Sequence, residues 1–113
     1  MTVQKLEKGQ WRSFFDRVSK GLDGKQAEIE VAALNLGDQV EAEWLPLFGI
    51  VYDPKSDVLE VALDGLDHMI QKPSEIYIDS SGQTLTSVEI VDAEGTKQLV
   101  KLRDQLMLPP AGR

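Results

Sequence analysis

The sequence predicts an α+β domain in which an N-terminal amphipathic helix packs on a mostly antiparallel, strongly curved sheet or partly open barrel of about seven strands. Three observations lead to this fold class. Apolar residues recur with helical spacing near residues 10–20. From residue 26 onward they alternate with polar residues in short runs, as in strands with one exposed face. Turn-forming residues separate these runs, and runs so close in sequence pair as antiparallel hairpins. A chain of 113 residues has room for a single domain, residues 1–113.

The predicted helix covers about residues 10–20. Its apolar side chains recur at i, i+3, i+4, i+7 and i+11 and so form one stripe, made of Trp11, Phe14, Phe15, Val18 and Leu22. Gly21 follows the last turn, where a glycine commonly ends a helix. We expect the stripe to pack into the core.

The predicted strands cover about residues 26–34, 39–44, 48–52, 58–63, 75–79, 86–91 and 96–103. Pro46 ends the first hairpin or places it at a sheet edge. Residues 53–57 are a turn, because Asp53 accepts backbone N–H bonds and Pro54 presets φ for a type I turn. Residues 64–74 are interpreted as the longest connection. Residues 106–113 lose periodicity and form a tail whose apolar residues 106–108 could complete an interface.

The negative charge of the chain is concentrated in its middle. The formal net charge is −7. Residues 1–25 carry six basic and three acidic residues, residues 26–96 two basic and fifteen acidic, and residues 97–113 four basic and one acidic. This balance argues against phosphate-backbone binding and against anionic lipid, so we expect neither nucleic acid nor a membrane as partner. We expect the basic ends to lie against or near the acidic sheet.

The composition also bears on cofactors and location. The chain has no cysteine, which excludes disulfides, thiolate nucleophiles and Cys-based metal sites. No apolar stretch resembles a signal peptide or is long enough for a membrane helix, so we expect a cytoplasmic protein. No cofactor is expected.

Several segments carry a resemblance to a known family. They are Trp11, Phe14 and Phe15 together with residues 45–53, 57–61, 65–70, 73–76 and 91–96. With these segments the chain resembles a family of short, uncharacterised bacterial proteins with a domain of unknown function. The resemblance implies a small standalone bacterial domain and brings no activity, substrate or catalytic residue.

Residues 64–68 are the best candidate site. On a helical turn, Asp64 and His68 would share a face with Asp67 beside them, and could bind a divalent ion or form a base–orienter pair. Tyr52 and Tyr77 are further candidate polar groups of a ligand site. Two carboxylates and one imidazole are too few for a closed zinc site, so we predict no metal and assign no catalytic residue. In the alternative interpretation the carboxylates cap backbone N–H groups of a loop.

Two functions remain open at the level of sequence. One is a small non-enzymatic interaction or regulatory domain, whose partner is another protein or a second copy of the chain in a homodimer; opposite charges at the ends and middle could dock between two chains. The other is a small-ligand-binding barrel or small enzyme, with a site near Asp64, Asp67 and His68. The second predicts a pocket with convergent polar groups.

Overall fold

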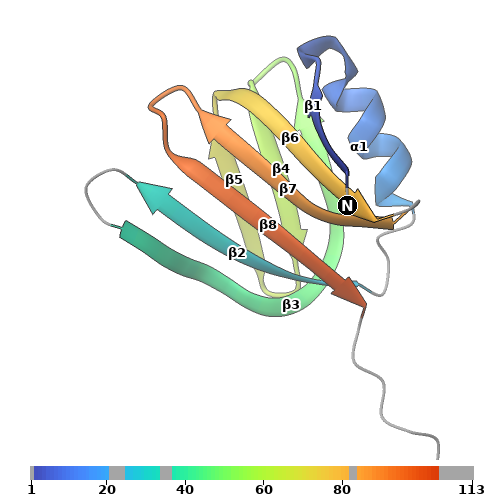
Figure 1. Ribbon diagram of the computed structural model, residues 1–113, viewed down its shortest axis with the longest axis vertical. Helices are drawn as coiled ribbons and strands as arrows, with labels where there is room; N and C mark the ends of the chain where they lie inside the picture. Colours follow the sequence, from blue (N-terminus) through green and yellow to red (C-terminus); the bar gives the residue numbers. More distant parts are fainter. Residues whose placement is uncertain (1, 21–24, 34–36, 82–83, 105–113) are drawn as a thin grey trace, which may run out of the picture.

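A computed structural model describes residues 2–20, 25–33, 37–81 and 84–104 of the chain (Figure 1). This part of the chain forms eight strands, one α-helix and one short 3-10 helix. The elements are, in order, β1 (Thr2–Leu6), η1 (Lys8–Gln10), α1 (Trp11–Ser19), β2 (Lys25–Ala33), β3 (Gly37–Asp53), β4 (Val58–Leu63), β5 (Leu66–Gln71), β6 (Pro73–Ser81), β7 (Thr84–Asp92) and β8 (Lys97–Asp104). Neither described helix is long and apolar enough to cross a membrane.

All eight strands belong to one antiparallel sheet in the order β1-β6-β7-β8-β2-β3-β4-β5. Strand β3 pairs with β2 along its first part and with β4 along its last part. The sheet therefore turns over on itself, and β4 and β5 lie behind β7 and β8 in Figure 1. Among the described strands no pairing joins β1 to β5, so the curved sheet does not close.

The bend of β3 has a local cause in its register shifts, two against β2 and one against β4. Ala27 pairs with Leu45 and Ile29 with Ala42, so two residues of β3 stand opposite one residue of β2. One of the two, Trp44, has a φ of 49°. The second shift against β2 falls between Ile29 and Glu30, and the shift against β4 falls between Leu47 and Gly49. An extra residue of this kind bends a strand and increases its twist. The bulges thus carry β3 from one layer to the other.

Helix α1 supplies aromatic side chains to the core, as its spacing predicts. Trp11 and Phe15 are buried, while Phe14 and Val18 are partly buried against the same core. The Trp11 ring meets the Tyr52 ring edge to face at 5.1 Å between centroids, and the Trp11 Nε1–H donates to the Leu6 carbonyl at 3.2 Å. The predicted packing of these four residues is confirmed; Leu22 and Gly21 lie outside the described residues.

Ser19, at the end of α1, takes the place of a partner strand for β3. Its hydroxyl donates to the Ile50 carbonyl at 2.8 Å and accepts the Ile50 N–H at 3.0 Å. Beyond Pro46, strand β2 no longer accompanies β3, which leaves this side of β3 without a strand in the described chain. One side chain therefore satisfies two backbone groups and fixes the helix on the sheet.

The prediction of a mostly antiparallel, curved sheet with one helix is confirmed, but the count of about seven strands is wrong. The predicted strands 39–44 and 48–52 are one strand, because β3 continues through Pro46. Strand β1 was not predicted, and residues 66–71, interpreted as part of a connection, form β5. The tail, residues 106–113, lies outside the described residues.

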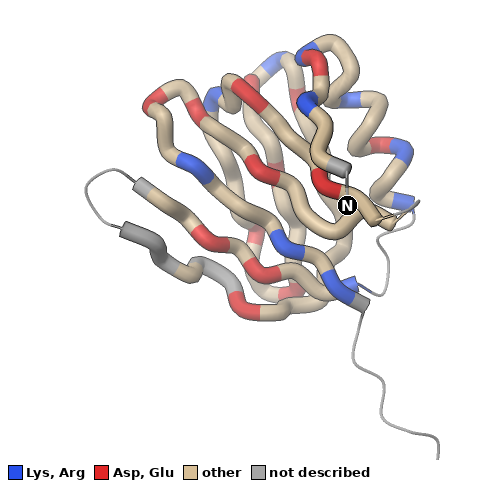
Figure 2. Tube along the Cα trace, in the orientation of Figure 1, with Lys and Arg blue, Asp and Glu red and all other residues tan. Residues whose placement is uncertain are grey.

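The basic residues occupy two different environments. In β8, Lys101 Nζ lies 2.9 Å from Glu30 Oε1 and 3.8 Å from Glu28 Oε1 on neighbouring β2. In β1, Lys5 Nζ lies 3.8 Å from Glu75 Oε1. These contacts agree with basic ends beside an acidic sheet. The basic residues of α1, Arg12 and Arg17, are instead exposed, and the helix lies at one end of the molecule (Figure 2).

Candidate functional site

The predicted candidates Asp64, Asp67 and His68 do not share a face. The helical turn expected for them is a strand, in which successive side chains point to opposite sides. Asp64 is exposed in the β4–β5 turn, and its N–H donates to the Pro46 carbonyl at 2.9 Å. Asp67 is exposed on the outer face of β5, while His68 points inward.

His68 joins the two layers of the sheet. Its Nε2 lies 2.5 Å from Oε1 of Gln98 on β8, a residue only 8% exposed. Buried polar side chains nearly always have a hydrogen-bond partner, and here the two side chains are partners of each other. The contact places β5 over the beginning of β8. In the described structure, His68 therefore serves to position β5 rather than to contact Asp64 or Asp67.

The two tyrosines lie in different environments. Tyr52 is buried in the core and donates its hydroxyl hydrogen to Asp57 Oδ1 at 2.7 Å. Burial, then the hydrogen bond and charge of Asp57, raise the pKa of Tyr52 to about 12. Tyr77 lies on β6, where it donates to Glu75 Oε2 at 3.0 Å, and this hydrogen bond to a carboxylate raises the pKa of Tyr77. No common pocket unites the five predicted residues in the described chain, and a ligand role for any of them stays a prediction.

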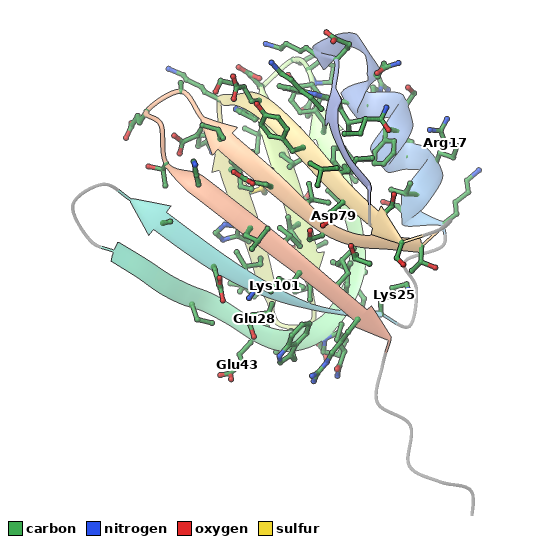
Figure 3. The ribbon with its side chains drawn as sticks, in the orientation of Figure 1. Arg17, Lys25, Glu28, Glu43, Asp79 and Lys101 are labelled. Carbon is green, nitrogen blue, oxygen red and sulfur yellow. The ribbon has the colours of Figure 1, made fainter. Side chains whose placement is uncertain are left out.

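Other polar groups lie outside the predicted site. The described residues contain no group of three or more His, Cys, Asp or Glu side chains placed to hold a metal ion. A hollow of about 300 Å³ on β2, β7 and β8 is lined by Glu30, Ala32, Glu89, Lys97 and Leu99. On the same sheet, Lys101 points toward Glu28, whereas Asp79 Oδ1 is buried without a hydrogen-bond partner among the described residues (Figure 3). These features describe a charged sheet surface.

Strand β5 has an unpaired side. The backbone groups of Ile50 bond to Ser19, on the side away from β4. Along two antiparallel strands, residue pairs that exchange backbone hydrogen bonds alternate with residue pairs whose N–H and C=O groups point away from each other, toward the next strands. Ile50 is paired in register with Val61, and Val61 with His68, so Val61 bonds to His68. The N–H and C=O groups of Asp67, Met69 and Gln71 must therefore point away from β4. We call this row of backbone groups the β5 edge.

Large apolar side chains are exposed beside the β5 edge. Met69 is 48% exposed, and Val51 of β3 is 46% exposed in the same cross-strand row, with Glu60 between them. Phe48, at the bulge of β3 against β4, is 63% exposed. Apolar side chains gathered on one face commonly mark an interaction surface.

The two ends of the β5 edge are defined by structure. At one end lies the turn that contains Gly65, whose φ is +79°. At the other end the Lys72 carbonyl accepts the Ala93 N–H at 2.9 Å, and the Lys72 N–H donates to the Asp57 carbonyl at 2.8 Å. A hollow of about 230 Å³ borders this end and is lined by Met69, Gln71, Lys72, Asp92, Ala93, Glu94 and Gln98. The β5 edge is thus held at its end and open along its length.

The elements predicted from the sequence did not include this surface. Met69 and Gln71 fell in the segment interpreted as a connection, and Phe48 and Val51 fell in a predicted strand, where apolar residues indicate core. The absence of lysine and proline from residues 66–71 could have served as a signal, because exposed edge strands usually carry such residues.

The comparisons with known proteins agree on a family. An uncharacterised protein of Aquifex aeolicus is 39% identical over 110 residues, which cover 96% of this chain and 99% of that protein. No solved structure matches the chain. The model of DUF5335, a family of unknown function, matches residues 2–111. This chain belongs to that family.

Proposed function

We propose that the protein is a small, non-enzymatic interaction domain of the cytoplasm that binds an extended protein segment along the β5 edge. The observation that carries this proposal is the row of outward-pointing backbone groups of Asp67, Met69 and Gln71. An added strand gains main-chain hydrogen bonds from such a row and specificity from the side chains beside it.

The surroundings of the β5 edge favour a protein over other ligands. Met69 offers an apolar contact to the side chains of an added strand. Of the charged residues nearby, Glu60, Asp64 and Asp67 are acidic and Lys72 is basic, and this net negative charge disfavours phosphate-rich partners. The His68–Gln98 contact and the Lys72 backbone bonds hold β5 in place, so little conformational entropy is lost on binding.

The test is capture of partners from cells of the protein's own source by a tagged chain, compared with two variants. Met69→Lys places a charge on the β5 edge, where it hinders strand addition. Val3→Lys is the matched control, because Val3 is a 68% exposed residue on β1, the other outermost strand. We expect proteins whose recovery falls at least tenfold with Met69→Lys and is unchanged with Val3→Lys. Equal recovery from all three chains, or no specific recovery, contradicts the proposal.

A further inference from the structure

We propose that the segment bound at the β5 edge is β5 of a second copy of the chain, so that two sheets join into one across a twofold axis at Met69. This inference rests on the proposed function and names its partner. It follows from the self-complementary arrangement of residues along the strand and from the lack of edge protection.

The backbone pattern fits a twofold antiparallel pair. Three alternate residues present their N–H and C=O groups at the edge, and Met69 is the middle one. When two such strands run antiparallel about Met69, Met69 faces Met69, and each Asp67 faces Gln71 of the other copy. All three positions then form bonded pairs, with about six backbone hydrogen bonds. A shift of the register by one residue would set the outward-pointing backbone groups of one copy opposite groups of the other copy that point toward its own β4, and these hydrogen bonds would be lost.

The side chains repeat this complementarity. The Gln71 amide can donate to the Asp67 carboxylate of the second copy, once on each side of the axis. The N-terminal end of β5 is acidic, with Asp64 and Asp67, whereas Lys72 is exposed at the C-terminal end. An antiparallel pair brings the acidic end of each strand beside Lys72 of the other. The two exposed Met69 side chains meet at the axis and cover each other's apolar surface.

The two outermost strands differ in protection. Strand β1 spans five residues and carries the exposed Lys5, a residue type that discourages edge pairing. Strand β5 has no lysine, no proline and no register shift against β4. Natural sheets protect edges that stay in solvent, so an unprotected edge with an exposed methionine is the one that a second copy covers.

The experiment uses the lack of cysteine in the chain. In Met69→Cys, the new cysteines of two paired copies would have Cα atoms about 5.5 Å apart, which a disulfide can bridge. In Glu60→Cys, the matched control on β4 directly beside Met69, they would be three strand spacings, about 14 Å, apart, which is too far for a disulfide. We expect mild oxidation to cross-link most of Met69→Cys and less than about a tenth as much Glu60→Cys. Equal cross-linking of the two variants overturns the proposed register.

Light scattering on the unmodified chain supplies the second measurement. The expected mass rises with concentration from 12.6 kDa toward twice that value, and Met69→Lys stays at the mass of one chain while Val3→Lys behaves as the unmodified protein. Circular dichroism shows whether each variant is folded. A single-chain mass at all concentrations up to about 1 mM overturns self-pairing. If partner capture still depends on Met69 in that case, the proposed function stands and its partner is another protein.

Discussion

The Ser19 hydroxyl fastens α1 to β3, and its removal should be costly for so small a change. In Ser19→Ala, the Ile50 N–H and C=O both lose their partner, at 3.0 and 2.8 Å in the native chain. An unsatisfied buried backbone group costs about 1–3 kcal/mol. Ser19 is partly exposed, so the lower end of that range applies to each group. We expect the free energy of unfolding to fall by about 2 kcal/mol.

Ser13→Ala is the matched control, because it makes the same change in the same helix. Ser13 is exposed, and its hydroxyl donates to the Gln10 carbonyl at 3.2 Å, where water can replace it. The expected change is within about 0.5 kcal/mol of zero. Denaturant unfolding measures both values, and amide hydrogen exchange should quicken at Ile50 in Ser19→Ala. If the two variants differ by less than about 0.5 kcal/mol, the Ser19 bonds do not secure the helix.

Three further predictions concern a buried tyrosine, an ion pair and a turn. The folded chain holds the Tyr52 proton up to a pKa of about 12, whereas the unfolded chain loses it near pH 10, so the free energy of unfolding should fall across that pH interval. Tyr52→Phe should lack this fall, and identical alkaline unfolding profiles of the two chains would contradict the prediction. The hydrogen bond from Lys101 lowers the pKa of Glu30, so its contribution to stability is present above the ordinary pKa and is lost as pH falls through the lowered one. In Lys101→Met the NMR-measured pKa of Glu30 should rise, and an unchanged value would refute the role of Lys101. Gly65→Ala, at a φ of +79°, should cost about 1 kcal/mol of unfolding free energy, whereas Gly9→Ala, in open space, should cost none; equal effects would exclude backbone strain as the cause.

The parts of the fold that could be predicted are those where the hydrophobic pattern and burial agree. Helix α1 combines a regular apolar stripe with deep burial of Trp11 and Phe15. Strand β4, predicted over residues 58–63, has its bounds as predicted, because its residues alternate between partly and fully buried. In α1 and β4 the whole element packs one face against the core, so the spacing of apolar residues in the sequence matches the helix or strand period.

The errors occur where tertiary contacts, and not the local sequence pattern, determine the secondary structure and its partners. Pro46 indicated either the end of a strand or a sheet edge; the first alternative is wrong, because β3 continues through Pro46 and changes its partner there. Strand β1 is short and carries the exposed residues Val3 and Lys5, so its pairing with β6 leaves little trace in the pattern. The Ser19–Ile50 bonds join residues 31 positions apart, and no local rule predicts such a contact.

The segment around the candidate site is a strand and not the expected helical turn, for a reason that also supports the role proposed for β5. In residues 66–71 a polar side chain, His68, points inward and an apolar one, Met69, points outward, so the segment lacks the alternation of a strand. The inward histidine is satisfied by Gln98 on the opposite layer. The outward methionine has no such compensation within the described chain, since 48% of it stays exposed. An apolar residue on the open side of an edge strand favours aggregation unless something covers it. The inward histidine and the outward methionine, which made β5 unrecognisable as a strand in the sequence, therefore suit a strand whose inner face contacts its own chain and whose edge contacts another chain.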